Sequence, residues 1–118
     1  MKADLHLHST ASDGTLEPGE LVALAAEQGF THLALTDHDS VDGLARATDA
    51  ARDCGVTLIP GVEISTGPGG RTHLLAYGAS GRNAPLAAFL AGVSAERRMR
   101  AGRILDRLAE AGLTVTPK

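Results

Sequence analysis

Short apolar runs alternate along this chain with longer segments in which apolar residues recur every three or four positions. The apolar runs lie at residues 3–9, 32–36, 56–59 and 71–77, and residues 62–65 follow the third run directly after Pro60-Gly61. Short runs of this kind predict strands, and their alternation with helical segments is typical of βα units around a mainly parallel sheet. We therefore expect an α/β fold.

The segments between the first three runs carry signals for helix starts and stops. Pro18 suits the first position of a helix that ends at Gly29. Ser40 suits the N-cap of a second helix that ends at Gly55. Asp42 would then lie in the first turn of that helix, where the helix dipole favours an anion.

The last third of the chain is predicted to be largely helical. Residues 67–70 are rich in glycine and predict a turn, and Pro85 is expected to start a short helix. A longer helix is expected from about Ser94 to Gly112, because four apolar residues lie on one helical face: Ala101, Ile104, Leu105 and Leu108. Residues 113–118 then begin an extended segment.

The first predicted strand carries two histidines two positions apart. Successive side chains of a strand point to opposite faces, so Asp4, His6 and His8 share one face. Two imidazoles placed in this way can converge on one metal ion. Asp4 could be a further ligand, or it could orient an imidazole from outside the ligand set.

Further candidate ligands follow the other predicted strands. His38 lies just beyond residues 32–36, and Glu63 lies between two apolar residues where a carboxylate must be paired or bound. Because strand ends at the carboxyl side of an α/β barrel meet at one rim, we expect both residues to lie near His6 and His8. Asp13 in the loop after the first strand and His73 on the strand after the glycine turn can reach the same rim.

These six candidates predict a metal centre with more than one ion. Histidine and carboxylate ligands without cysteine favour Zn, Mn or Fe. Six ligands exceed the need of one tetrahedral ion, and they suit two or three ions that share Glu63 as a bridging carboxylate. Two alternatives stay open: Asp13 lies in a Ser-Asp-Gly turn and could serve the turn alone, and His73 could be structural.

The helix expected near residues 94–112 is rich in arginine. Residues 94–118 hold six Lys/Arg and three Asp/Glu, although the whole chain has a formal charge of −3. One reading is a solvated face in which Glu96 and Glu110 pair with the arginines. The functional reading is that some of these arginines bind substrate phosphates through bidentate hydrogen bonds, with three candidates: Arg97, Arg98 and Arg100.

The composition limits the class of protein. A chain of 118 residues makes at most one ordinary domain or part of one, and its overall negative charge argues against wholesale electrostatic binding of nucleic acid. Cys54 is the single cysteine, so a disulfide framework is excluded and a reducing compartment is favoured. The sequence shows neither a long apolar span nor a leader, and we expect a cytoplasmic protein without membrane contact.

Four short motifs occur in order along the chain: Asp4-Leu5-His6-Leu7-His8-Ser9, Ser12-Asp13-Gly14, Thr36-Asp37-His38-Asp39 and Gly61-Val62-Glu63-Ile64-Ser65. Through them the sequence resembles the PHP (polymerase and histidinol phosphatase) family of metal-dependent phosphoesterases. It is most similar to the ribonuclease AM branch of 5′-to-3′ exoribonucleases and nucleoside 3′,5′-bisphosphate phosphatases. Two further segments carry that likeness: His73-Leu74-Leu75 and Glu96-Arg97-Arg98.

The resemblance implies a distorted (β/α)7 barrel that holds two or three divalent metal ions. By this resemblance, His6, His8 and Glu63 would hold one ion. Glu63 would bridge to a second ion, which His73 would also ligate.

The remaining site residues are also assigned by resemblance. Asp13 and His38 would hold a third ion, and together with Glu63 they would act directly in catalysis. Asp4 and Asp37 would orient the ligands. The implied reaction is in-line attack of an activated water on phosphorus.

The chain departs from the family pattern after His73. The family supplies a late histidine and a closing Asp-x-His pair, whereas no histidine follows His73 here. We therefore expect residues 1–118 to be an amino-terminal portion of the barrel, with ligand-bearing βα units at 1–82 and a helical segment at 83–118. The alternative is a natural short form completed by a partner chain. In both cases this chain alone does not close the barrel, and we expect it to be weakly active or inactive by itself.

The resemblance implies a phosphoesterase that acts on nucleotides or short RNA 5′ ends. Two alternatives remain open. One is a phosphatase for a small metabolite such as histidinol phosphate, and the other is a non-catalytic PHP module of a DNA polymerase.

Overall fold

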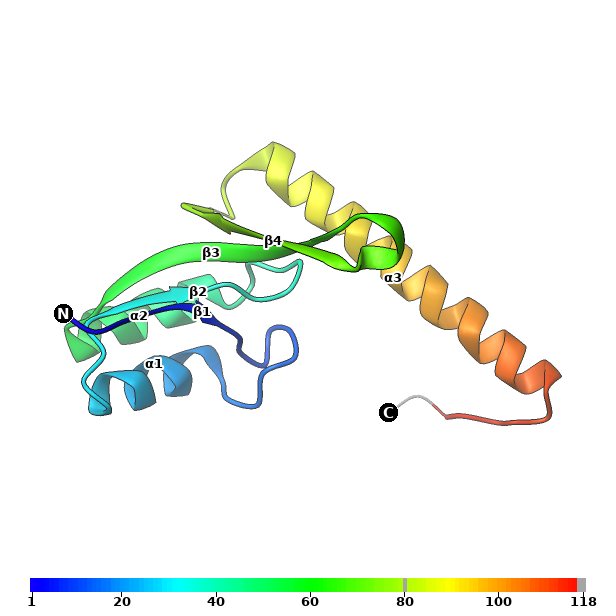
Figure 1. Cartoon of the computed structure of the whole chain (residues 1–118), viewed down its shortest axis with the longest axis horizontal. Coiled ribbons are helices and arrows are strands. Elements are labelled where there is room, and N and C mark those ends of the chain that lie inside the picture. Colours follow the sequence, from blue (N-terminus) through cyan, green and yellow to red (C-terminus); the bar gives the residue numbers. More distant parts are fainter. Residues whose placement is uncertain (80, 117–118) are drawn as a thin grey trace.

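The computed structural model describes residues 1–79 and 81–116. Its sheet has four strands in the order β1 (Ala3–Leu7), β2 (His32–Leu35), β3 (Thr57–Thr66) and β4 (Thr72–Tyr77). The first three strands are parallel, and β4 runs antiparallel to β3 through a turn that contains the short 3-10 helix η1 (Pro68–Gly70) (Figure 1). The expected α/β fold is confirmed.

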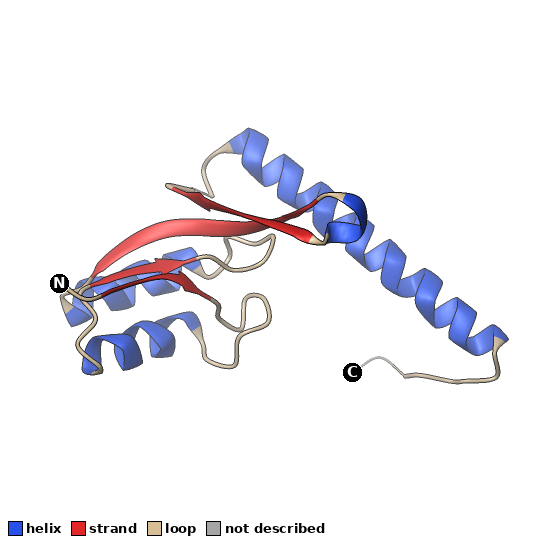
Figure 2. Cartoon of the chain, in the orientation of Figure 1, coloured by secondary structure: helices blue, strands red, loops and turns tan. Residues whose placement is uncertain are grey.

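Helices α1 (Pro18–Glu27) and α2 (Leu44–Cys54) lie together against one face of the sheet (Figure 2). Between them and the sheet lies the main hydrophobic core, whose buried residues are Val22, Leu33, Leu35, Leu44, Ala47 and Ala51. Leu33 and Leu35 point toward the helices, which leaves the alternate positions of β2 on the opposite face. Burying each such leucine stabilises the fold by about 1.5–3 kcal/mol.

The start of α1 follows the sequence prediction. Pro18 occupies the first turn, and Glu17 is the N-cap of a capping box in which Glu20 accepts a hydrogen bond from the Glu17 N–H at 3.2 Å. Gly29 follows the helix with φ +82°, a conformation that glycine adopts without a steric penalty.

The predicted start of α2 is wrong. Ser40 is not the N-cap, because its Oγ atom accepts a hydrogen bond from the Asp42 N–H at 3.2 Å within the preceding loop. The helix begins at Leu44 with Gly43 as N-cap, so Asp42 lies outside the first turn. A Cβ atom at Gly43 would lie 3.1 Å from the Asp37 carboxylate and 3.2 Å from Leu35. Tight packing therefore sets where this helix starts.

Two strands differ from their predicted bounds. The strand expected at 3–9 ends at Leu7, so His8 lies beyond β1. The separate runs at 56–59 and 62–65 form one continuous strand, β3, because Pro60 pairs with Leu35 in the parallel ladder and its carbonyl accepts hydrogen bonds from Gly78 and Ala79.

Helix α3 (Ala84–Glu110) is a single helix, whereas two helices were expected. Asn83 caps its start by accepting a hydrogen bond from the Leu86 N–H at 3.0 Å, and the lone Gly92 does not interrupt it. Leu90 packs with Val62 and Ala79 in a second hydrophobic cluster. The carboxyl half of α3 extends away from the sheet (Figure 1).

Residues 113–116 after α3 form no regular element, and the rest of the segment expected at 113–118 lies outside the described residues. None of the helices in the described part of the chain is both long and apolar enough to cross a membrane.

The sheet is curled, so that a side-chain hydrogen bond reaches from one outer strand to the other. The Tyr77 hydroxyl on β4 donates to the Leu5 carbonyl on β1 at 2.9 Å, although β1 and β4 stand at opposite ends of the strand order. No strand ladder joins them within residues 1–79 and 81–116, so the sheet is an open half-barrel there.

Candidate metal centre

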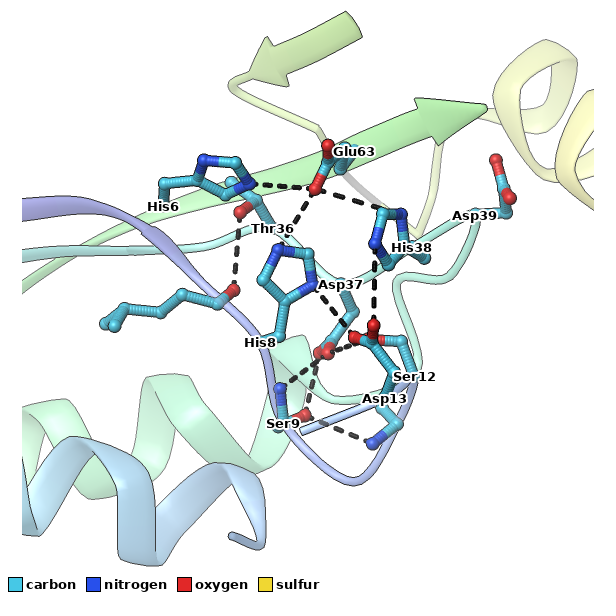
Figure 3. A network of polar contacts seen from close by, with 12 residues as sticks. His6, His8, Ser9, Ser12, Asp13, Thr36, Asp37, His38, Asp39 and Glu63 are labelled. Atoms are coloured by element: carbon cyan, nitrogen blue, oxygen red, sulfur yellow. Dashed lines mark hydrogen bonds and ion pairs between the residues drawn. The ribbon is translucent and has the colours of Figure 1, made fainter. Parts of the chain in front are cut away.

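The six predicted ligands lie together at one end of the curled sheet. We call them the Glu63 cluster: His6, His8, Asp13, His38, Glu63 and His73. Glu63 lies on β3, and Figure 3 shows three of the histidines, His6, His8 and His38, turned toward its carboxylate.

Both carboxylate oxygens of Glu63 face histidines. Its Oε2 atom lies 2.8 Å from Nε2 of His6, 3.0 Å from Nε2 of His8 and 3.7 Å from Nδ1 of His38. Its Oε1 atom lies 2.8 Å from Nδ1 of His73. One carboxylate therefore lies between the imidazoles of His6, His8 and His38 on one oxygen and that of His73 on the other.

The backbone explains why His38 and Glu63 meet. After β2 ends at Leu35, the chain rejoins β3 in an isolated parallel bridge between His38 and Glu63. Glu63 N–H donates to the Asp37 carbonyl at 3.1 Å, and Asp39 N–H donates to the Glu63 carbonyl at 2.9 Å. These bonds fix the loop that carries His38 beside the Glu63 side chain.

Asp13 lies on the other side of the histidines. Its carboxylate is 3.4 Å from Nδ1 of His8 and 3.7 Å from Nε2 of His38. The imidazoles are closely spaced, with ring centroids 4.6 Å apart for His8 and His38 and 4.9 Å apart for His38 and His73.

The donor atoms of the cluster fit divalent metal ions. They form three overlapping groups in which the nitrogen and oxygen atoms lie within 4.8 Å of one another: His6, His8 and Glu63; His8, Asp13 and His38; His38, Glu63 and His73. The Nδ1 atoms of His8 and His38 are buried without a hydrogen-bond partner. Buried polar atoms rarely stay unpaired, so ligation would satisfy both. Histidine and carboxylate donors suit divalent transition metals.

Glu63 keeps its negative charge at neutral pH. Burial raises the pKa of this carboxyl, but a hydrogen bond from His6, the nearby charge of His38 and a hydrogen bond from His73 outweigh burial and lower its pKa below 4.5. The side chain is only 6% exposed. An ionised buried carboxylate of this kind is suited to a cation.

Asp37 holds a loop and makes no hydrogen bond to an imidazole. Its carboxylate accepts hydrogen bonds from the Ser9 N–H at 2.7 Å, the Ser9 hydroxyl at 2.7 Å and the Ser12 hydroxyl at 2.6 Å (Figure 3). This loop leads to Asp13, so Asp37 acts on the position of Asp13. Gly14 follows Asp13 in the same loop. A Cβ atom at Gly14 would lie 2.3 Å from the His8 carbonyl oxygen, so the loop as it stands leaves no room for a side chain there.

Asp4 also acts through the backbone. Its Oδ1 atom accepts a hydrogen bond from the His6 N–H at 3.2 Å. Asp4 is not part of any of the three ligand groups within the described residues.

The three candidate phosphate-binding arginines line a cavity of about 1210 Å³ together with Asp13, His38 and His73. Arg97 is paired with Asp39 at 2.5 Å, and Arg98 donates to the Ser94 hydroxyl at 2.9 Å. In the described part of α3, no ion pair joins an arginine to Glu96 or Glu110, so the pairing expected for a solvated face is not formed.

Sequence reasoning missed two residues beside the cluster, Asp39 and Ser65. The sequence shows Asp39 only as a neighbour of His38, and nothing in it predicts that this carboxylate turns toward Ser65 and Arg97. Ser65 could have been found from its place two positions beyond Glu63, on the same face of β3.

Comparisons with known proteins agree with this geometry. The family model described as PHP domain matches residues 4–106. The chain is 46% identical over 113 residues to a 5′-3′ exoribonuclease of Haemophilus influenzae, with 95% of this chain and 41% of that protein covered. It is 40% identical over 111 residues to a 3′,5′-nucleoside bisphosphate phosphatase of Chromobacterium violaceum, with 93% of this chain and 39% of that protein covered.

A solved structure is also similar. An amidohydrolase from Chromobacterium violaceum with bound sulfate superposes with a TM-score of 0.85 at 38% identity, covering 98% of this chain and 41% of that one. The chain therefore spans about 40% of the length of the relatives that it matches.

Proposed function

Because this chain belongs to the PHP domain family, we propose that it forms part of the catalytic site of a metal-dependent phosphoesterase. The observation that carries the proposal is the position of Glu63, whose two carboxylate oxygens face four imidazoles. A structural ion pair would need one histidine beside this carboxylate, whereas a bridging metal ligand needs several.

The Glu63 cluster would hold two or three divalent ions, Mn, Zn or Fe. His6, His8 and Glu63 would hold one ion, and Glu63 and His73 would hold a second. Asp13 and His38 would hold a third. When bound, such ions would lower the pKa of a coordinated water and take up negative charge on phosphate oxygens.

The chain's own residues would bind and orient the phosphate ester. Glu63 would stay ionised and hold the imidazoles of His6 and His73 against its carboxylate, each at 2.8 Å. Asp4 and Asp37 hold the backbone on either side of His8. Arg97, Arg98 and Arg100 line the same cavity and would donate hydrogen bonds to phosphate oxygens.

The proposed substrates are nucleotides and short RNA 5′ ends. A cavity of about 1210 Å³ is large enough for a nucleotide, since ligand pockets typically measure about 300–1,000 Å³. Relatives named as a 5′-3′ exoribonuclease and a 3′,5′-nucleoside bisphosphate phosphatase support this substrate class.

We further propose that residues 1–118 are a partial catalytic domain, with the metal ligands in 1–82 and a helical segment in 83–118. The rest of a PHP domain, or a partner chain, would complete the site, because the sheet is open and the relatives are longer. The exposed, unpaired Cys54 suits the reducing cytoplasm that we expect for this protein.

A substrate panel on the full-length protein with Mn²⁺ tests the proposal. We expect hydrolysis of a nucleoside 3′,5′-bisphosphate and of a short 5′-phosphorylated RNA, loss of hydrolysis with chelator, and recovery with Mn²⁺. His73→Gln should impair hydrolysis. His32→Gln is the matched control, because His32 lies outside the cluster and contacts Thr31.

Three outcomes would contradict the proposal. Hydrolysis of histidinol phosphate or a sugar phosphate but not of nucleotides would overturn the substrate class. Activity that survives chelation would overturn the role of the metal. A protein that hydrolyses none of these esters with Mn²⁺ would be a non-catalytic module.

A further inference from the structure

Asp39 has an unusual backbone conformation next to the Glu63 cluster. It is the one residue other than glycine with positive φ in the part of the chain that the structure describes, at +50°. A non-glycine residue in this region costs about 1–3 kcal/mol, and such strain persists only where surrounding contacts hold it. The contacts of Asp39 must therefore hold this backbone conformation in place.

Those contacts tie three elements together. The Asp39 N–H donates to the Glu63 carbonyl at 2.9 Å, and Asp39 Oδ1 accepts a hydrogen bond from the Ser65 N–H at 2.8 Å. Asp39 Oδ2 accepts a hydrogen bond from Arg97 Nη2 at 2.5 Å, and its side chain is only 4% exposed. A buried carboxylate thus joins the loop after β2 to β3 and to α3.

Helix α3 has few other anchors. Leu90 is its one buried residue among those that the structure describes, and the helix continues far beyond it. Arg97 lies about two turns after Leu90, and its pair with Asp39 ties this part of the helix to the loop after β2. Arg97 also donates to the Ser65 hydroxyl at 3.3 Å.

Arg97 keeps donors free for a ligand. An arginine side chain has five N–H donors, and both hydrogen bonds of Arg97 use Nη2. The side chain is 58% exposed and lines the cavity with His38 and His73. Ser65 is the cross-strand partner of His73, so the guanidinium lies beside the metal ligands.

We propose that Asp39 is a positioning residue that fixes Arg97 at the rim of the cavity, so that the N–H donors of Arg97 that Asp39 and Ser65 leave unused receive a phosphate group of the substrate. This inference rests on the proposed phosphoesterase function and assigns a role to a residue outside the metal ligands. A guanidinium that a buried carboxylate already holds in place offers its remaining N–H donors with little loss of side-chain entropy on binding.

The test measures binding of inorganic phosphate to the Mn²⁺-loaded full-length protein by calorimetry, together with kcat and KM for a phosphate ester. The variants are Asp39→Asn, Arg97→Gln and the double variant. Asp39→Asn keeps an oxygen for the Ser65 N–H and replaces the charged oxygen that accepts from Arg97 by an amide NH2 group, which cannot accept that hydrogen bond. Asp49→Asn is the control, because it breaks an exposed aspartate–arginine pair with Arg52 on α2.

We expect Asp39→Asn and Arg97→Gln each to weaken phosphate binding and to raise KM by about tenfold or more, as the loss of a charged hydrogen bond does. The double variant should bind phosphate as strongly as Arg97→Gln alone and should have the same KM, because both changes remove the same interaction between Asp39 and Arg97. Mn²⁺ affinity should stay unchanged, since neither residue is in the ligand groups.

Other outcomes overturn the inference. If the variants lower the melting temperature but leave phosphate binding and KM unchanged, the pair only anchors α3. Additive losses in the double variant would show that Asp39 does not act through Arg97. If wild-type protein binds phosphate without hydrolysing any ester, the proposed function fails while the role of Arg97 can still be measured; absence of phosphate binding overturns that role.

Discussion

Oε2 of Glu63 lies 2.8 Å from Nε2 of His6. This contact joins β3 to β1, although β2 lies between these two strands. Such a contact across an intervening strand requires both side chains to lean over the same face of a curled sheet. The Tyr77–Leu5 hydrogen bond shows that the sheet has this curl. The fold therefore brings residues from β1 and β3 close enough to share one ion.

Replacing Glu63 should weaken metal binding more than replacing any exposed glutamate. We expect Glu63→Gln to lower the affinity for Mn²⁺ by at least about tenfold, because even residues that only support ligands change affinity by that amount. Isothermal titration of chelator-treated protein with Mn²⁺ measures this. Glu27→Gln, at the exposed end of α1, is the control. Equal affinities in the two variants would contradict the role of Glu63.

Asp37 should matter for the loop that leads to Asp13. Asp37→Asn replaces one of the two acceptor oxygens that bind Ser9 and Ser12 by an amide nitrogen, so a buried hydroxyl loses its acceptor. We expect a loss of about 1–3 kcal/mol in the free energy of unfolding, measured by urea denaturation. Asp42→Asn in the neighbouring loop should change it little, and a similar loss in that variant would argue against our account of Asp37.

Replacing each of two glycines by alanine should change the stability of the fold in opposite directions. At Gly14 a Cβ atom would lie 2.3 Å from the backbone carbonyl of His8, so we expect Gly14→Ala to cost about 1–3 kcal/mol of stability. At Gly92, inside α3, a Cβ atom meets open space, and alanine should stabilise the helix by up to about 1 kcal/mol. Thermal unfolding of both variants measures these two changes in stability. A stable Gly14→Ala protein would mean that the loop can move away from His8.

The charge of Glu63 should make the metal-free protein less stable in acid. Burial raises the pKa of Glu63, but its bonds to His6 and His73 and the charge of His38 lower it below 4.5 overall. A carboxyl with a lower pKa in the folded chain stabilises the fold fully above pH 4.5, and this contribution is lost as the pH falls through the folded pKa.

The measurement is urea unfolding between about pH 3 and 6 with chelator present, for wild type and Glu63→Gln. Above about pH 5, we expect the difference in unfolding free energy between the two proteins to be constant. Below pH 4.5, the wild type should lose stability relative to Glu63→Gln. A difference that does not depend on pH would contradict the lowered pKa.

The grouping of the ligands was predictable, whereas the details around it were not. His38 follows β2 and Glu63 lies on β3, which runs parallel to β2, so the two residues meet where β2 ends. The start of α2 depends on the space between Gly43, Asp37 and Leu35, which is a tertiary contact that local sequence does not report. The role of Asp39 depends on a positive φ, which aspartate rarely adopts and which no local signal predicted here.

Anomalous diffraction from crystals grown with Mn²⁺ would locate the metal ions relative to Glu63. We expect anomalous peaks within about 2–2.5 Å of ligand atoms of Glu63, one shared with His6 and His8 and another shared with His73. Saturating Mn²⁺ with no anomalous peak at bonding distance from Glu63 would contradict this expectation.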